Sequence, residues 1–339
     1  MNLKSNFLIN KMTKVILISG GSGAIGKNLI KNLCNYASEI IVLDNFITSD
    51  PDQFDTFKYN ILQFNHEIKI TLFDFDITNP KMIPFIKERY CIINEIYHLA
   101  SLASPIAYKK YPLQTLDTGY IGTKNMLELA YHYNSKLLLA STSEVYGDPD
   151  ISPQIESYYG NVNSFGCRAS YDESKRVAEA LCYTYINKYN VDIKIARIFN
   201  TYGPHMSIDD GRIVTECIRH LINNTTLTIF GDGNQTRSCC FVDDTVDMLV
   251  KLMESNCNIP VNIGNNEEMS VNQIVDTIEK VYQEHFYKKC TLKKEYIELT
   301  QDDPLIRQPC LKLNKQILGE TNYTTFEDGI IKTIKYFIE

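Results

Sequence analysis

A tyrosine and a lysine four positions apart, Tyr171 and Lys175, have the types and spacing for acid–base chemistry. Residues four apart lie on one face of a helix, so the Lys175 ammonium can lower the pKa of the Tyr171 phenol and hold the ribose of a nicotinamide cofactor. A phenol tuned in this way can accept the proton of a substrate hydroxyl. The spacing by itself is weak evidence, because the chain has 22 tyrosines and Tyr120 and Lys124 repeat it.

A hydroxyl-rich strand end distinguishes the Tyr171 pair from its repeat. The run Ser141-Thr142-Ser143-Glu144 ends an apolar, strand-like stretch that begins at residue 136. Hydroxyl groups at the end of a strand can meet a helix-borne tyrosine over a bound cofactor. We therefore predict that this run and Tyr171 belong to one site.

A glycine-rich run, Gly20-Gly21-Ser22-Gly23-Ala24-Ile25-Gly26, follows the first predicted strand and opens a helix. Such glycines let the backbone turn sharply and approach a pyrophosphate, whose charge the helix N-terminus meets. Asp44, 18 residues after Gly26, ends the next predicted strand, where a carboxylate can bind an adenosine ribose. An acid there repels a 2′-phosphate, which favours NAD over NADP. Asp76 fits the adenine side of this site, although a solvated loop carboxylate is nearly as good an interpretation.

Alternating apolar and amphipathic stretches indicate how these residues are positioned. Strands are predicted at 15–19, 39–44, 68–73, 95–100, 136–141 and 192–199, and helices at 24–37, 81–90, 113–132 and 171–189. The alternation predicts an α/β fold of the Rossmann type, with a doubly wound parallel sheet and helices on both faces. We assign 14–200 to an NAD-binding domain, with a return at 238–265 that includes a strand at 261–263. A smaller, mainly helical C-terminal domain for nucleotide-sugar binding takes 201–237 and 266–339, with helices at 211–223, 243–254 and 270–286.

Composition excludes several classes of protein. The chain has 339 residues, 44% hydrophobic and 22% charged, which is globular, and its net charge of −7 argues against a nucleic-acid partner. Its six histidines lack metal-ligand spacing, so we expect no metal. Ten cysteines without a CxxC pair indicate a reducing cytoplasm. The apolar patch Phe7-Leu8-Ile9 is too short for a signal or a membrane span, so we expect no membrane partner.

Longer blocks make the chain similar to the extended short-chain dehydrogenase/reductase family, and within it to the UDP-glucuronate decarboxylases, also called UDP-xylose synthases. The matching blocks are 96–101 (IYHLAS), 138–149 (LLASTSEVYGDP), 168–179 (RASYDESKRVAE), 196–204 (ARIFNTYGP), 210–212 (DGR), 235–237 (QTR) and 303–309 (DPLIRQP). The triplet Thr142-Ser143-Glu144 discriminates within the family, because 4,6-dehydratases typically carry Thr-Asp-Glu there and epimerases usually lack the Glu. The resemblance thus favours a decarboxylase.

The resemblance implies conversion of UDP-glucuronate to UDP-xylose by oxidation at C4, loss of CO2 from the 4-keto intermediate and re-reduction by the retained NADH. A 4,6-dehydratase or 4-epimerase acting on another nucleotide sugar remains the alternative. A non-enzymatic NAD-binding regulator on the same fold is a second alternative. Retention of Tyr171, Lys175, Thr142 and Glu144 together argues against that regulator.

Site roles follow from the same resemblance. Tyr171, assisted by Lys175 and Thr142, would take the C4 hydroxyl proton, while Glu144 with Ser143 would manage the departing carboxylate and the C5 proton. Arg307 is the candidate for binding the uronate carboxylate, with a surface arginine as the alternative. Arg237 and Asn200 would contact the diphosphate, and Tyr108 would line the sugar pocket or be a packed aromatic. The cofactor would be contacted by Gly20, Gly23, Ala24, Ile25, Gly26, Asp44, Asn45, Thr48, Asp76, Ile77, Leu99, Ser101, Thr118, Ala140, Tyr171, Lys175, Thr201 and Arg212.

Three departures from the family pattern bear on rate and substrate fit. Gly119 stands where relatives carry an asparagine of the proton relay, and a glycine there weakens the helix by about 1 kcal/mol. Asp117 stands where relatives often have lysine, and Cys239-Cys240 replaces an aromatic-containing pair. Family members commonly dimerise through the helices that correspond to 113–132 and 171–189, which implies a homodimer.

Overall fold

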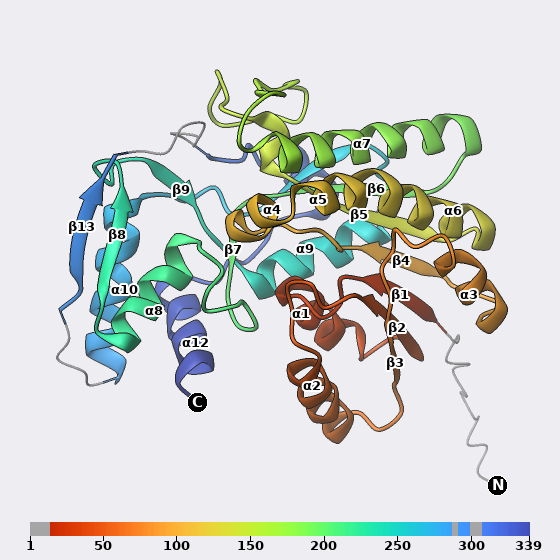
Figure 1. Cartoon of the computed structure of the whole chain (residues 1–339), viewed down its shortest axis with the longest axis horizontal. Coiled ribbons are helices and arrows are strands. Elements are labelled where there is room, and N and C mark those ends of the chain that lie inside the picture. Colours follow the sequence, from red (N-terminus) through yellow and green to blue (C-terminus); the bar gives the residue numbers. More distant parts are fainter. Residues whose placement is uncertain (1–13, 287–290, 299–306) are drawn as a thin grey trace, which may run out of the picture.

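The computed structural model describes residues 14–286, 291–298 and 307–339. The patch Phe7-Leu8-Ile9 and the first part of the 303–309 block lie outside the described residues. A seven-stranded sheet forms the centre of the molecule, with the order β11-β6-β5-β4-β1-β2-β3 and every neighbouring pair parallel (Figure 1). Its strands are β1 Val15–Ser19, β2 Glu39–Asp44, β3 Lys69–Asp74, β4 Glu95–His98, β5 Lys136–Thr142, β6 Ile193–Ile198 and β11 Pro260–Ile263.

The inner strands form because their sequences are nearly continuous apolar runs. All five residues of β1 are buried, and six of the seven in β5 are buried. Strands covered on both faces by helices read in this way, whereas half-exposed strands alternate. The predicted α/β fold with a parallel doubly wound sheet is confirmed, and the strand at 261–263 does join the sheet, beside β6.

Helices cover both faces of the sheet. α1 Ala24–Leu33, α2 Pro51–Phe64 and α9 Val242–Glu254 lie on the left and lower side of the sheet in Figure 1, and α3 Met82–Arg89, α6 Thr123–Tyr133 and α7 Ala169–Tyr189 lie on its right and upper side. Two separate hydrophobic clusters match this division, one containing Leu29, Phe54 and Leu249, and the other containing Met126 and Cys182. No described helix is long and apolar enough to cross a membrane.

Two helical segments differ from the sequence prediction. α2 was not predicted, because only Phe54 and Phe57 of its apolar residues are buried; Asp50 caps it by accepting a hydrogen bond from Asp52 N. The predicted helix 113–132 is broken into α5 Pro112–Asp117, a π-helical turn η1 Thr118–Gly122 and α6. The π turn coincides with Gly119, where an added Cβ would lie 2.5 Å from the Ser174 Cβ of α7.

The C-terminal part is more mixed than the mainly helical domain that the sequence predicted. It contains α8 Ile213–Asn223, α10 Val271–Phe286, α11 Lys312–Leu318 and α12 Phe326–Ile338. Three two-stranded pairs accompany them, formed by β7 Thr201–Tyr202 with β10 Cys240–Phe241, β9 Thr236–Ser238 with β12 Glu268–Ser270, and β8 Thr226–Phe230 with β13 Lys293–Ile297. These short strands lack the long apolar runs of the main sheet, which is why they were missed.

Candidate active site

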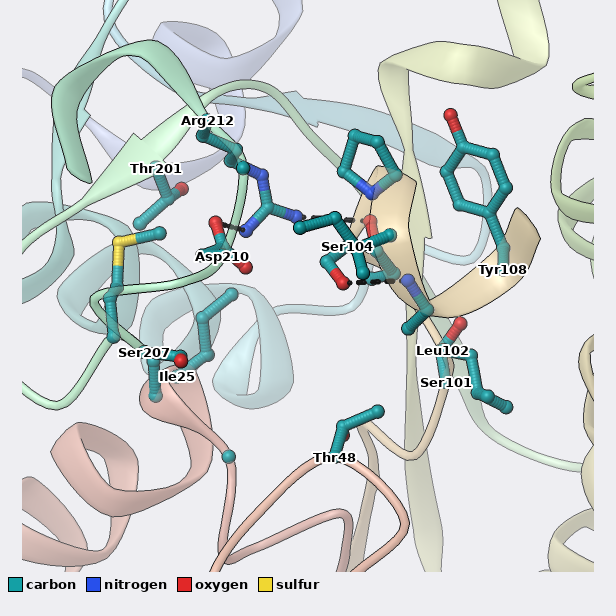
Figure 2. Close-up of a pocket in the computed structure, with 18 of the residues that line it drawn as sticks. Ile25, Thr48, Ser101, Leu102, Ser104, Tyr108, Thr201, Ser207, Asp210 and Arg212 are labelled. Carbon is teal, nitrogen blue, oxygen red and sulfur yellow. Dashed lines mark hydrogen bonds and ion pairs between the residues drawn. The ribbon is translucent and has the colours of Figure 1, made fainter. Parts of the chain in front are cut away.

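One cavity of about 1820 Å³ lies between the carboxyl ends of the central strands and the C-terminal part. Ligands of open α/β sheets bind at this edge, where the strand order reverses between β1 and β4. Every residue that the sequence analysis assigned to the site lines this cavity. Figure 2 shows part of the lining, drawn from α1, the loops after β2 and β4, α4 Pro105–Lys110 and the loop before α8.

The glycine-rich turn has the shape that a pyrophosphate requires. Gly20 has φ +72°, and a Cβ there would lie 2.6 Å from Ala100 N; a Cβ on Gly26 would lie 2.6 Å from Gly20 O. Gly23 is the N-cap of α1 and supplies no side-chain cap, while a Cβ on it would meet nothing nearer than 3.4 Å. The first turn of α1 is therefore open toward the cavity, where an anion would meet its amides.

Asp44 links the end of β2 to this turn. Its Oδ2 accepts a hydrogen bond from Ser22 N at 2.9 Å, and its Oδ1 accepts from Phe46 N at 3.0 Å. Burial raises the pKa of Asp44, and the two backbone hydrogen bonds oppose that rise. Asp76 is exposed and accepts from Asn45 Nδ2 at 3.1 Å, so two of the predicted adenine-side residues contact each other.

Tyr171, Lys175 and Thr142 lie together and are buried. Lys175 Nζ donates to Ala140 O at 2.8 Å and lies 5.9 Å from the centre of the Tyr171 ring. Burial lowers the pKa of Lys175 to about 8, with the Glu179 charge opposing it. Burial raises the pKa of Tyr171, while a hydrogen bond with Thr142 and the charge of Arg212 lower it. Burial thus has the largest effect on the pKa of Tyr171 in this structure, and the lowering of that pKa by Lys175 stays a prediction.

Glu144 lies between two arginines in the short helix η2 Ser143–Tyr146. Its Oε2 pairs with Arg168 and its Oε1 with Arg307. The exposed fractions of the Glu144, Arg168 and Arg307 side chains are 12%, 16% and 7%, so little water screens these charges. Burial lowers the pKa of Arg307 to about 10. The cavity thus holds a carboxylate between two guanidinium groups, next to Thr142.

Arg168 is the functional candidate that the sequence analysis missed. It lies three residues before Tyr171, inside the block 168–179, and α7 begins directly after it. An arginine one turn before a predicted general base on the same helix was the available signal. The pairing with Glu144 depends on the fold, because η2 and the start of α7 are far apart in the sequence.

The other predicted substrate residues and Arg212 line the same cavity. The rings of Tyr108 and Tyr171 stack with centroids 5.1 Å apart and an interplanar angle of 10°. Arg212 donates to Asp210 Oδ2 at 2.7 Å and to Ala103 O at 3.1 Å, which places its guanidinium group across the cavity from Tyr108 (Figure 2). Arg237 donates to Thr236 O at 2.8 Å on β9, and Asn200 O accepts from Cys240 N at 2.8 Å.

The departure at Gly119 has a structural explanation. A side chain at position 119 would collide with Ser174, so Gly119 permits the close approach of η1 and α7. Cys239 lines the cavity, and burial raises the pKa of its thiol to about 12.

The nine cysteines that the structure describes are all free. Within the same residues no group of three His, Cys, Asp or Glu side chains could hold a metal ion.

A parallel Rossmann sheet, an open glycine turn beside a strand-end acid, and a buried Tyr–Lys pair define a nicotinamide-dinucleotide enzyme of the short-chain dehydrogenase/reductase type. The sequence profile of the NAD dependent epimerase/dehydratase family matches residues 16–264, and the chain belongs to that family. Its cofactor is NAD, as the sequence predicted.

Two relatives and one solved structure are similar to this chain over most of its length. UDP-glucuronic acid decarboxylase 3 of Arabidopsis thaliana is 42% identical over 316 residues, which cover 93% of this chain and 86% of the relative. UDP-glucuronic acid decarboxylase 1 of Danio rerio is 41% identical over 331 residues, 98% of this chain and 74% of the relative. UDP-glucuronic acid 4-epimerase of Bacillus cereus, solved with UDP-glucuronic acid and NAD, has a TM-score of 0.81 at 25% identity, covering 95% of this chain and 98% of that one.

Proposed function

We propose that this chain decarboxylates UDP-glucuronate to UDP-xylose with bound NAD. The observation that carries the proposal is the Glu144 carboxylate held between Arg168 and Arg307, in the same cavity as Tyr171 and Thr142. Two guanidinium groups form a site that matches a uronate carboxylate in charge, and each can bind a carboxylate through two N–H groups. The relatives at 41% and 42% identity, named as decarboxylases of UDP-glucuronic acid, support the assignment.

Tyr171 is the base that takes the proton of the C4 hydroxyl. Its hydrogen bond with Thr142 orients the phenol, and Lys175, anchored on Ala140 O, supplies positive charge 5.9 Å from the centre of the ring. NAD bound in this cavity would supply the hydride acceptor for oxidation at C4 and the hydride donor for the later re-reduction. The residues that would hold NAD are those assigned from the sequence. They include the glycine turn, Asp44, Thr201 and Arg212, and all of them line the cavity.

Arg307 and Arg168 hold the carboxylate on C5 in this proposal. Oxidation at C4 makes the sugar a β-keto acid, so the C5–carboxylate bond breaks, its electrons enter the ketone as an enolate, and CO2 leaves. Glu144, displaced from Arg307 by the substrate carboxylate, then acts with Ser143 on the proton that C5 receives. Arg237 and Asn200 bind the diphosphate and Tyr108 lines the sugar pocket, which makes 201–237 and 266–339 the nucleotide-sugar-binding domain.

A 4-epimerase is the second candidate function. The UDP-glucuronic acid 4-epimerase of Bacillus cereus, solved in complex with UDP-glucuronic acid and NAD, shares the fold at a TM-score of 0.81. An epimerase returns a sugar of unchanged mass, a decarboxylase releases CO2, and a 4,6-dehydratase consumes UDP- or dTDP-glucose instead. Product masses after incubation with each of these nucleotide sugars separate the three, and conversion of UDP-glucuronate without mass loss would refute the decarboxylase.

The assembly is a homodimer in this proposal, formed through α5, α6 and α7. These helices carry exposed large apolar side chains, with Leu113 72% and Tyr183 69% exposed. Light scattering of the purified protein tests the dimer, and a monomer mass would overturn it.

The nine free cysteines accord with a reducing cytoplasm. Fractionation of the source cells, followed by immunoblotting, tests that compartment.

A further inference from the structure

The main chain that carries Arg307 is bound to a second segment near Gln154. Gln154 and Pro309 form a parallel bridge, in which Gln154 N donates to Gln308 O and Cys310 N donates to Gln154 O, both at 2.8 Å. On the other side, Ser238 N donates to Arg307 O at 3.3 Å. The Arg307 segment is thus held between the loop after η2 and strand β9.

The side chain of Gln154 adds two hydrogen bonds to this bridge. Its Oε1 accepts from Gln308 N at 2.8 Å, which is the peptide N–H directly after Arg307. Its Nε2 donates to Ile151 O at 2.9 Å. Gln154 is 1% exposed, so water cannot replace either bond, and losing one leaves a buried polar group without a partner.

The same residue is connected to the helix of Glu144. Asn262 Nδ2, on β11, donates to Gln154 O at 3.0 Å and to Cys310 O at 3.2 Å, and Asn262 Oδ1 accepts from Tyr146 OH at 2.8 Å. Tyr146 ends η2, which also contains Glu144. A single buried network therefore joins the backbone on either side of the ion pair between Glu144 and Arg307.

We propose that Gln154 is a positioning residue for Arg307 and so sets the preference of the site for a uronate carboxylate. Gln154 acts through the Gln308 peptide and not through contact with substrate. The inference rests on the proposed function, in which Arg307 binds the carboxylate. Displacing the Arg307 segment by less than the length of a hydrogen bond is enough to spoil a two-point guanidinium–carboxylate contact.

The test compares binding of UDP-glucuronate with binding of UDP, in the presence of NAD and in a Tyr171→Phe background that stops turnover. Gln154→Leu keeps the size of the side chain but removes both polar atoms. We expect this substitution to weaken the binding of UDP-glucuronate about tenfold, while the affinity for UDP changes by less than about twofold. Gln154→Glu keeps an oxygen for Gln308 N but loses the donor to Ile151 O, so it should restore only part of the preference. Gln308→Ala is the matched control, because its side chain donates only to Asn266 O, at 3.1 Å.

Arg307→Met separates the two proposals. If Arg307→Met lowers the preference for UDP-glucuronate and Gln154→Leu does not, the positioning role is overturned while the proposed function stands. If Arg307→Met leaves the preference unchanged, Arg307 does not bind the carboxylate, and both proposals about it fall. Should Gln154→Leu not fold, as judged by circular dichroism, Gln154→Ser replaces it, since its smaller side chain admits a water to Gln308 N. An unchanged ratio in Gln154→Ser overturns the positioning role equally.

Discussion

Glu144, in the short helix after β5, forms a buried ion pair with Arg307, which enters the cavity from the C-terminal segment. Breaking a buried pair by removing one partner leaves an uncompensated charge, which costs far more than the net value of the pair. A substrate carboxylate can take the place of Glu144 on Arg307 without leaving the charge of the Arg307 guanidinium group unpaired. The free protein therefore carries, in its own side chain, the charge arrangement that we expect for the bound uronate.

Replacing Glu144 by Gln should lower the free energy of unfolding by about 3 kcal/mol, because two guanidinium groups lose their carboxylate. Urea denaturation measures this loss. Saturating UDP-glucuronate should stabilise the variant more than saturating UDP does, since only the former supplies a carboxylate. Equal stabilisation by the two nucleotides would contradict a carboxylate site at these arginines.

Replacing Tyr171 by Phe should reduce turnover of UDP-glucuronate by at least about 10²-fold, because the general base is removed. The ring, its stacking on Tyr108 and the glycine turn proposed to contact the cofactor all remain. NAD affinity, measured by titration calorimetry, should therefore be nearly unchanged. Unaltered turnover would show that another group is the base.

Lys175 gives a prediction for pH. Burial lowers its pKa to about 8 in the folded chain, against an ordinary value of 10.5 in the unfolded chain. The unfolded state thus binds more protons between these values, so the Lys175 contribution to stability rises as pH increases through this window. Relative to Lys175→Met, the wild type should gain unfolding free energy between pH 7.5 and 9.5. A constant difference between the two proteins would show that the ammonium is not desolvated.

Gly119 gives a test of the contact between η1 and α7. Gly119→Ala places a Cβ 2.5 Å from the Ser174 Cβ, so the two helices must separate, and we expect a loss of about 1–3 kcal/mol in stability. Turnover should fall too, because Ser174 precedes Lys175. Gln114→Ala, at an exposed position on α5, is the control and should change stability by less than about 0.5 kcal/mol. A stable Gly119→Ala would mean that the contact is loose.

Local patterns in the sequence predict the parts of the site that short segments build. The glycine turn, Asp44 and the Tyr171–Lys175 spacing are each readable within a strand, a turn or a helix, and all of them line the cavity. The resemblance to a family supplied Glu144 and Arg307, although the roles of these residues remain predictions. Their pairing was not predictable, because it joins η2 to a segment that the fold brings back from the C-terminal part.

The misses have physical causes. Arg168 was overlooked because an arginine before a helix is ordinarily solvated, and only the tertiary contact with Glu144 reveals it. The helix at 113–132 was predicted as continuous, since nothing in its periodicity shows that α7 approaches closely enough to require a glycine and a π turn. α2 escaped detection because it buries only two large side chains.

The most direct test of the account is to incubate the purified protein with UDP-glucuronate, with and without added NAD, and to follow CO2 and the mass of the sugar nucleotide. We expect CO2 in equal amount to a UDP-pentose lighter by about 44 mass units, with no net NADH, because the hydride is returned to C4. Accumulation of a UDP-4-keto-pentose with NADH would point to an oxidative decarboxylase. A product of unchanged mass, or no conversion while UDP- or dTDP-glucose is consumed, would contradict the central claim.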